Sequence, residues 1–79
     1  MNSSTKKNEA LQARLRFVEY LLEEYGHLNR RIVAGYFSIS ETQVSDDMTR
    51  YIKMAPTNIT YDTSKKCYVR GPQFAPLWR

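Results

Sequence analysis

The chain has 79 residues, which is enough for one domain with a modest hydrophobic core but too few for an active-site cleft between two domains. Hydrophobic residues make up 42% of the chain and aromatic residues 13%, a composition typical of a folded domain and unlike a disordered tail. The formal net charge of +4 suits a polyanionic partner, although such a charge is also common among unrelated small proteins.

Redox and targeting features favour the cytoplasm. The single cysteine, Cys67, cannot form a disulfide within the chain, and the N-terminus shows no basic segment followed by an apolar one. No apolar run approaches the roughly 20 residues that span a bilayer. We therefore expect a cytoplasmic protein without membrane contact.

Residues 1–7 are polar after the initiator and predict a flexible N-terminal tail. From Asn8 to Tyr25 the apolar residues recur at the spacing of one helical face, and Gly26 then ends the helix. That face consists of Leu11, Leu15, Val18, Leu22 and Tyr25. Phe17 and Leu21 lie beside this stripe and widen it, so both are candidates for contact with a partner subunit.

Two further helices carry start signals. Asn29 can cap a short helix from Arg30 to about Phe37. Ser40 begins a third helix, and Gln43 completes the S-x-x-Q form of a capping box. Pro56 stops that helix because it lacks an amide and disfavours helical geometry at the residue before it. The inward face of the third helix comprises Val44, Met48, Tyr51, Ile52 and Ala55.

Beyond the third helix the pattern changes to short β-prone segments. Residues 59–61 and 67–69 predict two strands, and the turn-rich residues 62–66 between them predict a β-hairpin. The folded domain is thus expected over residues 8–70. Residues 71–79 form a C-terminal extension that would dock on the body or on a partner. Its apolar side chains, Phe74, Leu77 and Trp78, are further candidates for dimer contacts.

This order of elements predicts the α+β class with mainly α content, as a winged helix-turn-helix of three helices and a β-hairpin wing. In that fold the third helix enters the major groove of DNA and the wing touches the backbone. Short domains of three helices that do not bind DNA can share this order of elements.

The third helix carries polar side chains opposite its inward face, where they could read base edges. These candidate base readers are Thr42, Gln43, Ser45, Asp46, Thr49 and Arg50. An ordinary solvated helix face is the alternative. Because this helix has three acids and two bases, we expect attraction to phosphates from other places as well. Candidate backbone contacts are Arg30, Arg31, Ser40, Lys53, Lys65 and Lys66. Asp47, near the core, is expected to be a structural partner.

Three segments carry a more specific pattern. Residues 40–51 contain Gln-x-Ser-x-Asp, residues 55–58 read Ala-Pro-Thr-Asn, and residues 61–69 contain Tyr-Asp-x-Ser-x-Lys-x-Tyr. Together they resemble the N-terminal winged-helix domain of WYL-domain transcriptional repressors of the BrxR/CapW group. The resemblance implies a homodimeric repressor that binds an inverted repeat upstream of a bacterial phage-defence operon. It also implies that Gln43 and Ser45 read bases and that Lys66 is a wing contact.

The chain departs from this group at Arg79, where the family would continue into a linker and a WYL domain. Ligand sensing is therefore not expected of this chain, and no small-molecule ligand is predicted. An excised domain and a natural short relative both remain open.

Two other classes of function compete with DNA binding. An enzyme or a zinc site would need a set of reactive or ligating side chains, and the chain has one His and one Cys, so neither an enzyme nor a cofactor is expected. The stronger alternative is a winged helix used for protein contact. Such a phage or plasmid accessory protein would use Phe17, Leu21 and Trp78 to pair with another regulator.

Overall fold

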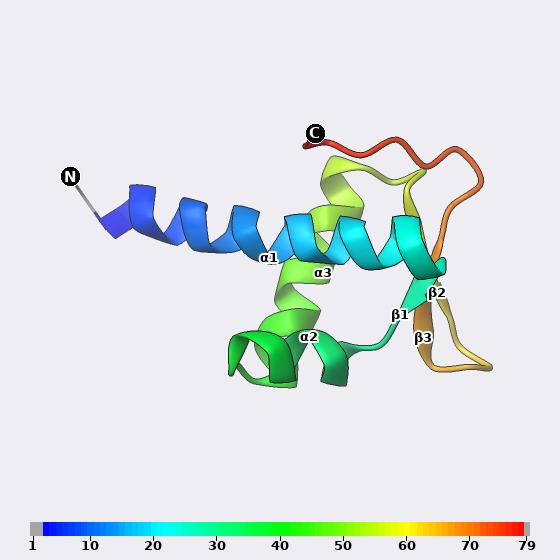
Figure 1. The fold of residues 1–79 in the computed structure, drawn as a ribbon, viewed down its shortest axis with the longest axis horizontal. Coiled ribbons are helices and arrows are strands. Elements are labelled where there is room, and N and C mark those ends of the chain that lie inside the picture. Colours follow the sequence, from blue (N-terminus) through cyan, green and yellow to red (C-terminus); the bar gives the residue numbers. More distant parts are fainter. Residues whose placement is uncertain (1–2, 79) are drawn as a thin grey trace.

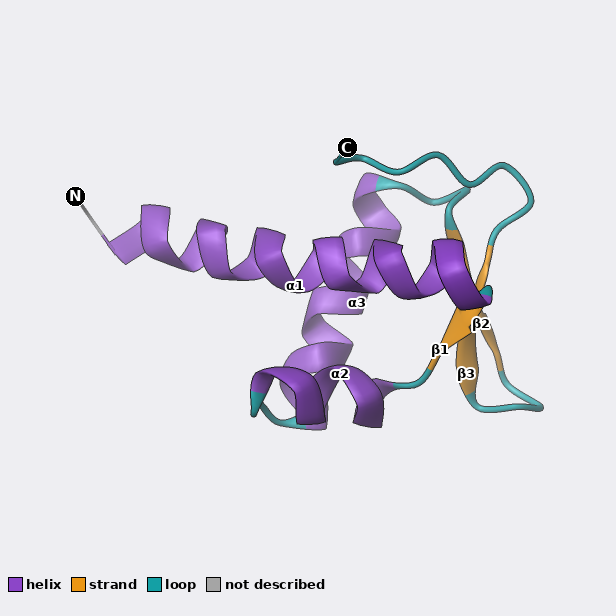
Figure 2. Cartoon of the chain, viewed as in Figure 1, coloured by secondary structure: helices purple, strands orange, loops and turns teal. Residues whose placement is uncertain are grey.

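Three helices and a small antiparallel sheet make up residues 3–78, the part of the chain that the computed structural model describes (Figure 1, Figure 2). In chain order the elements are α1 (Ser3–Tyr25), β1 (His27–Leu28), α2 (Arg30–Phe37), α3 (Glu41–Met54), β2 (Ile59–Asp62) and β3 (Cys67–Arg70). This is the predicted winged helix-turn-helix, with one strand more than the expected hairpin.

Helix α1 begins at Ser3 and not at Asn8, so it is longer than predicted. Residues 3–7 contain neither proline nor glycine, so they can extend a helix that the core-facing turns have already nucleated. Most of the predicted flexible tail is therefore helical, and Met1 and Asn2 lie outside the described residues. At its other end α1 stops at Gly26, whose φ of 79° is the left-handed value expected there.

The inward face of α1 differs from the predicted stripe at its C-terminal end. Leu15, Val18 and Leu22 are buried as predicted, but Tyr25 is 62% exposed. Leu21 is 7% exposed and belongs to the core cluster. Leu21 also lines a hollow with Leu28, Asn29 and Ile32, so it stays a candidate contact to a partner subunit.

Side-chain caps begin both later helices as predicted. Asn29 Oδ1 accepts a hydrogen bond from the amide of Ile32 at 2.9 Å, and Ser40 Oγ accepts from the amide of Gln43 at 3.0 Å. The capping box forms differently from the prediction, because the Gln43 side chain turns toward Asp47, one turn along the helix. Helix α3 ends at Met54, two residues before Pro56.

The core lies where α1 crosses α3 and where α2 packs beside them. Helix α2 contributes Val33 and Ala34, and α3 contributes Val44, Met48 and Tyr51, all of them buried. Ile59 from β2 and Leu28 from β1 close the core at the sheet. The outer face of α3 is left exposed by this packing.

The sheet has the order β1-β3-β2, with both pairs antiparallel. Tyr61 and Tyr68 face each other across the predicted hairpin, with ring centroids 4.8 Å apart. Strand β1 was not predicted, since a strand of two residues shows no periodicity. It pairs Leu28 with Tyr68 and so joins the wing to the start of α2.

The turn of the wing is held by Asp62, whose Oδ1 accepts from the amides of Ser64 and Lys65. Lys66 completes the turn with a left-handed φ of 55°. After β3 the chain passes very close to Thr57, because a Cβ atom at Gly71 would lie 2.0 Å from the Thr57 carbonyl oxygen. Only glycine fits at this crossing.

A buried carboxylate, that of Glu19 in α1, holds the C-terminal segment against the helices. Its Oε2 accepts from Tyr51 Oη at 2.6 Å and from the amide of Leu77 at 2.7 Å, and its Oε1 accepts from the amide of Trp78 at 3.3 Å. Asn58 donates to Tyr51 Oη at 3.0 Å and exchanges two hydrogen bonds with the backbone of Ala75. Phe74 and Trp78 are half-buried and pack on the core from this segment.

Among the described residues, none of the helices combines the length and the apolar character needed to cross a membrane.

Replacing Glu19 by glutamine tests this buried carboxylate. The amide turns one acceptor into a donor while three neighbouring donors still point at it, so we expect Glu19→Gln to lower the free energy of unfolding by about 1–3 kcal/mol. Urea denaturation would measure the loss. Glu24→Gln, which makes the same change at an exposed position of α1, should stay within about 0.5 kcal/mol of the parent. Equal stability of the two variants would contradict the role of Glu19.

The same cluster predicts sensitivity to alkaline pH. Burial, and then the hydrogen bond to Glu19, raise the pKa of Tyr51 well above its ordinary value of 10.0. The unfolded chain therefore releases this proton at a lower pH than the folded chain, so the contribution of Tyr51 to stability is complete below pH 10.0 and declines above it. Urea denaturation at a series of alkaline pH values should show this decline. The decline of stability with pH should be shallower in Tyr51→Phe. An equal decline in this variant and in the parent chain would show that Tyr51 does not cause it.

Candidate nucleic-acid interface

The outer face of α3 presents exposed polar side chains, as the helical spacing predicted. Thr42, Asp46, Thr49, Arg50 and Lys53 are all exposed. Gln43 and Ser45 are half-buried at the two edges of this face. Each of these two edges is held by a side chain from another helix, which the spacing within α3 did not reveal.

At one edge Gln43 belongs to a network that crosses from α3 to α1. Its Nε2 donates to Asp47 Oδ1 at 3.0 Å. Arg14 of α1 donates to both carboxylate oxygens of Asp47, from Nε to Oδ2 at 2.5 Å and from Nη2 to Oδ1 at 3.0 Å. Asp47 is 2% exposed, so it is the structural partner that the sequence indicated. Arg14 was missed, because an arginine on a helix that is otherwise amphipathic carries no signal of its partner.

At the other edge Ser45 is held from α2. Arg30 Nη1 donates to Ser45 Oγ at 2.7 Å. The Ser45 carbonyl accepts from Thr49 Oγ1 at 3.0 Å, so the hydroxyl proton of Thr49 is used within the helix. The two hydroxyl groups remain able to accept from a ligand, and Ser45 can also donate.

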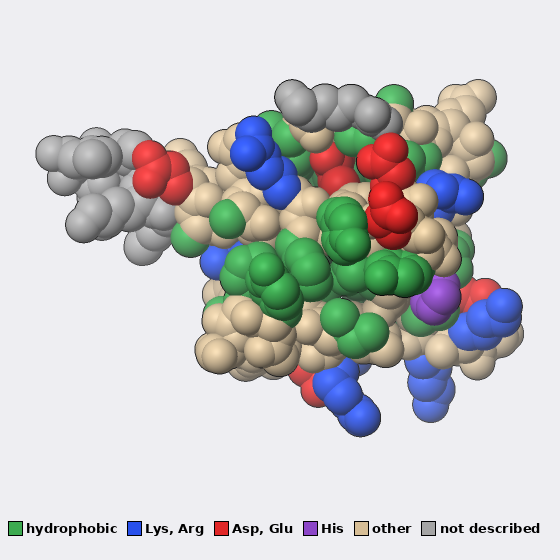
Figure 3. Space-filling view, viewed as in Figure 1, with side chains coloured by type: hydrophobic (Ala, Val, Ile, Leu, Met, Phe, Trp, Pro, Cys, Tyr) green, Lys and Arg blue, Asp and Glu red, His purple; other side chains and the backbone are tan. Residues whose placement is uncertain are grey.

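A basic hollow lies between the start of α2, the start of α3 and the wing. It is lined by Asn29, Arg30, Arg31, Glu41 and Lys66. Arg30 also lies near the wing: burial raises the pKa of Tyr68 in β3, and the positive charge of Arg30 opposes this rise. Figure 3 shows Lys and Arg side chains projecting from the lower edge of the molecule.

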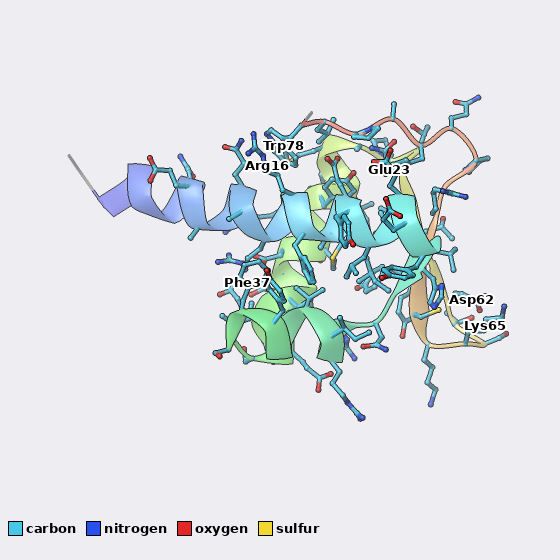
Figure 4. All side chains as sticks on the ribbon, viewed as in Figure 1. Arg16, Glu23, Phe37, Asp62, Lys65 and Trp78 are labelled. Atoms are coloured by element: carbon cyan, nitrogen blue, oxygen red, sulfur yellow. The ribbon has the colours of Figure 1, made fainter. Side chains whose placement is uncertain are left out.

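The remaining candidate backbone contacts are placed differently. Lys65 lies at the tip of the wing, close to Asp62 (Figure 4). Ser40 is exposed at the start of α3, where its hydroxyl already caps the helix. Lys53 lies in the last turn of α3, about 18 Å along the helix axis from Glu41. The structure therefore gathers Arg30, Arg31 and Lys66 in one place and sets Lys53 apart from them.

A second surface, on α1 and α2, is apolar. We call it the aromatic face, and it consists of Phe17, Tyr20, Tyr25, Ile32 and Tyr36. Phe17 stacks on Tyr36 with ring centroids 4.1 Å apart, and Tyr36 is 68% exposed. Figure 3 shows hydrophobic side chains gathered on the face of the molecule where α1 and α2 lie. Leu21, Tyr25, His27, Leu28, Asn29 and Ile32 line a largely apolar hollow beside it.

The candidate dimer contacts in the C-terminal segment are mostly used within the chain. Phe74 and Trp78 are half-buried on the core, whereas Leu77 remains largely exposed. Within residues 3–78, no group of three or more His, Cys, Asp or Glu side chains is arranged to hold a metal ion.

The chain is similar to known proteins over most of its length. Residues 10–79 match the family described as the BrxR transcriptional regulator winged helix-turn-helix domain. Proteins named DNA-binding transcriptional repressor CapW are similar over most of this chain. The one from Pseudomonas aeruginosa is 40% identical over 67 residues, which are 85% of this chain and 22% of that protein. The one from Escherichia coli strain KTE188 is 37% identical with the same coverage, and the one from Stenotrophomonas maltophilia is 33% identical over 76 residues, 96% of this chain and 25% of that protein. The chain thus spans about a quarter of the length of these relatives.

Proposed function

The chain belongs to the BrxR winged helix-turn-helix family, and on this premise we propose that it binds double-stranded DNA as the operator-binding domain of a transcriptional repressor. The relatives named as DNA-binding transcriptional repressors support this proposal, and so does the arrangement of its polar surface. A protein-contact module remains the second candidate, and the aromatic face is the observation that favours it.

The observation that carries DNA binding is the basic hollow beside the outer face of α3. Arg30, Arg31 and Lys66 come from α2 and from the wing, so they would bind phosphates at the edge of the groove that α3 enters. The helix itself would then read base edges through the exposed Thr42, Asp46 and Arg50 and through the two edge residues. Thr49 would add an acceptor, and Ser40, Lys53 and Lys65 would add backbone contacts.

We propose further that the chain binds as a homodimer on an inverted repeat. A single domain of this size offers few base contacts, and two copies would double them at half-sites about one helical turn apart. The aromatic face is the surface we assign to the second copy, because soluble monomers rarely expose an apolar patch of several aromatic side chains. Of the candidates predicted from sequence, Phe17 lies in this face.

The biological setting is also part of the proposal. The resemblance to the BrxR/CapW group implies an operator in a bacterial phage-defence or mobile-element operon. A repressor of that kind acts on DNA in the bacterial cytoplasm, at the nucleoid, and performs no catalysis and needs no cofactor.

Arg31→Gln tests the backbone contacts. Removing this charge should weaken binding to every duplex several-fold without changing sequence preference, because phosphates carry no base information. The slope of log affinity against log salt should become shallower by about one unit for each phosphate that the variant no longer neutralises. Fluorescence anisotropy over a series of salt concentrations would measure both effects.

Arg16→Gln provides the matched control, since it removes the same charge from an exposed position of α1 (Figure 4). It should leave the slope unchanged. If the parent chain binds no duplex at low salt and instead binds a protein partner, the second candidate function holds and the first is wrong.

Tyr36→Glu tests the homodimer. The side chain is mostly exposed, so the substitution should leave the fold intact, but it places a charge inside the proposed interface. Sedimentation velocity should show a shift from dimer to monomer, with at least a tenfold rise in the dissociation constant, equivalent to about 1.4 kcal/mol. Gln73→Glu introduces the same charge at an exposed position of the C-terminal segment and should leave the dimer intact. A monomeric parent chain on a duplex with one half-site would count against the homodimer.

A further inference from the structure

We infer that Asp47 and Arg14 are positioning residues that hold Gln43 in one orientation and so make it select adenine over guanine. The inference rests on the proposed DNA binding and adds a determinant of base choice that lies outside the outer face of α3. Neither Asp47 nor Arg14 needs to touch DNA for this role.

The Gln43–Asp47 contact permits only one direction of hydrogen bonding. A carboxylate oxygen can only accept a hydrogen bond, so the Gln43 atom that faces Asp47 Oδ1 at 3.0 Å must be the amide nitrogen. Turning the amide over would bring two oxygen atoms together. The Gln43 side chain therefore has one favoured orientation, whereas a glutamine free in solvent has two.

The carboxylate of Asp47 is itself held in place by Arg14. Arg14 binds both of its carboxylate oxygens, and this fork geometry fixes the plane of the carboxylate. Asp47 is also 2% exposed, so solvent does not compete for it. The orientation of Gln43 is thus set by α1 through Asp47, and it is set before any DNA arrives.

The oriented amide of Gln43 can offer one acceptor and one donor to a base. Gln43 keeps its Oε1 acceptor and the second N–H of its amide nitrogen, since Asp47 uses only one N–H. Adenine presents the N6 donor beside the N7 acceptor in the major groove, which matches this pair. Guanine presents two acceptors there, N7 and O6, and the fixed Oε1 would oppose one of them. A glutamine free to turn its NH₂ group toward guanine would discriminate less.

Asp47→Asn is the decisive substitution, because asparagine can accept from or donate to Gln43 and so permits both orientations of its amide. The full chain, its Asp47→Asn variant and its Gln43→Ala variant would each select duplexes from a random pool, followed by sequencing. Gln43→Ala identifies the base position that Gln43 reads. At that position, Asp47→Asn should reduce the preference for adenine over guanine about tenfold, with preferences at other positions unchanged. A double variant of both residues should show no larger reduction than Gln43→Ala alone.

If Asp47→Asn does not unfold cooperatively in a thermal melt, Arg14→Lys replaces it as the test variant. Lysine keeps the positive charge on α1 but lacks the forked guanidinium that binds both carboxylate oxygens of Asp47. It should reduce the preference at the same position by several-fold. Glu24→Gln is the control for a change of charge and should select the parent sequence. If the parent selects a sequence and the folded Asp47 or Arg14 variants select it with the same preference, the inference is wrong. If the parent retains no duplex at low salt, the proposed function itself fails.

Discussion

The carboxylate of Glu19 is the group on which the arrangement of the domain depends. It is 3% exposed, and the hydrogen bonds it accepts come from a tyrosine hydroxyl of α3 and from two amides of the C-terminal segment. Burying a carboxylate costs several kcal/mol unless donors surround it, so these three segments must come together at one place. Tyr51 then fixes how α3 lies across α1, and Asn58 ties the same hydroxyl to the segment that follows β3.

With the inner side of α3 fixed in this way, its two edges are fixed by cations from the other helices. Arg14 reaches Asp47 from α1, and Arg30 reaches Ser45 from α2. The helix is therefore held at three points around its circumference, and its outer face stays open to solvent. The proposed role of α3 in reading bases needs this restraint, because a hydrogen bond to a base edge discriminates only if the donor and the acceptor are already in place.

The sequence predicted the elements that depend on local chemistry. The caps at Asn29 and Ser40, the glycine end of α1 and the hairpin are confirmed, since each depends on a few neighbouring residues. The contacts that tie the elements together were not predictable. Glu19 follows Val18 on a helix, where a charged residue normally faces solvent, and Arg14 gives no sign of its partner 33 residues away. The short β1 is likewise a product of pairing with β3. The spacing of apolar residues in α1 did not reveal that Leu21 is buried while Tyr25 is exposed.

The structure also changes how the charges of α3 are counted. The sequence shows three acids and two bases on this helix, which looks unfavourable for binding a polyanion. Asp47, however, is buried against Arg14, so the acids that could repel DNA are Glu41 and Asp46, against Arg50 and Lys53. Helix α3 is then close to neutral, and in the proposed complex the basic hollow would carry the electrostatic attraction to DNA. Such a division would keep affinity for arbitrary DNA moderate, because the helix would add little to phosphate binding, and would leave its hydrogen bonds to decide between sequences.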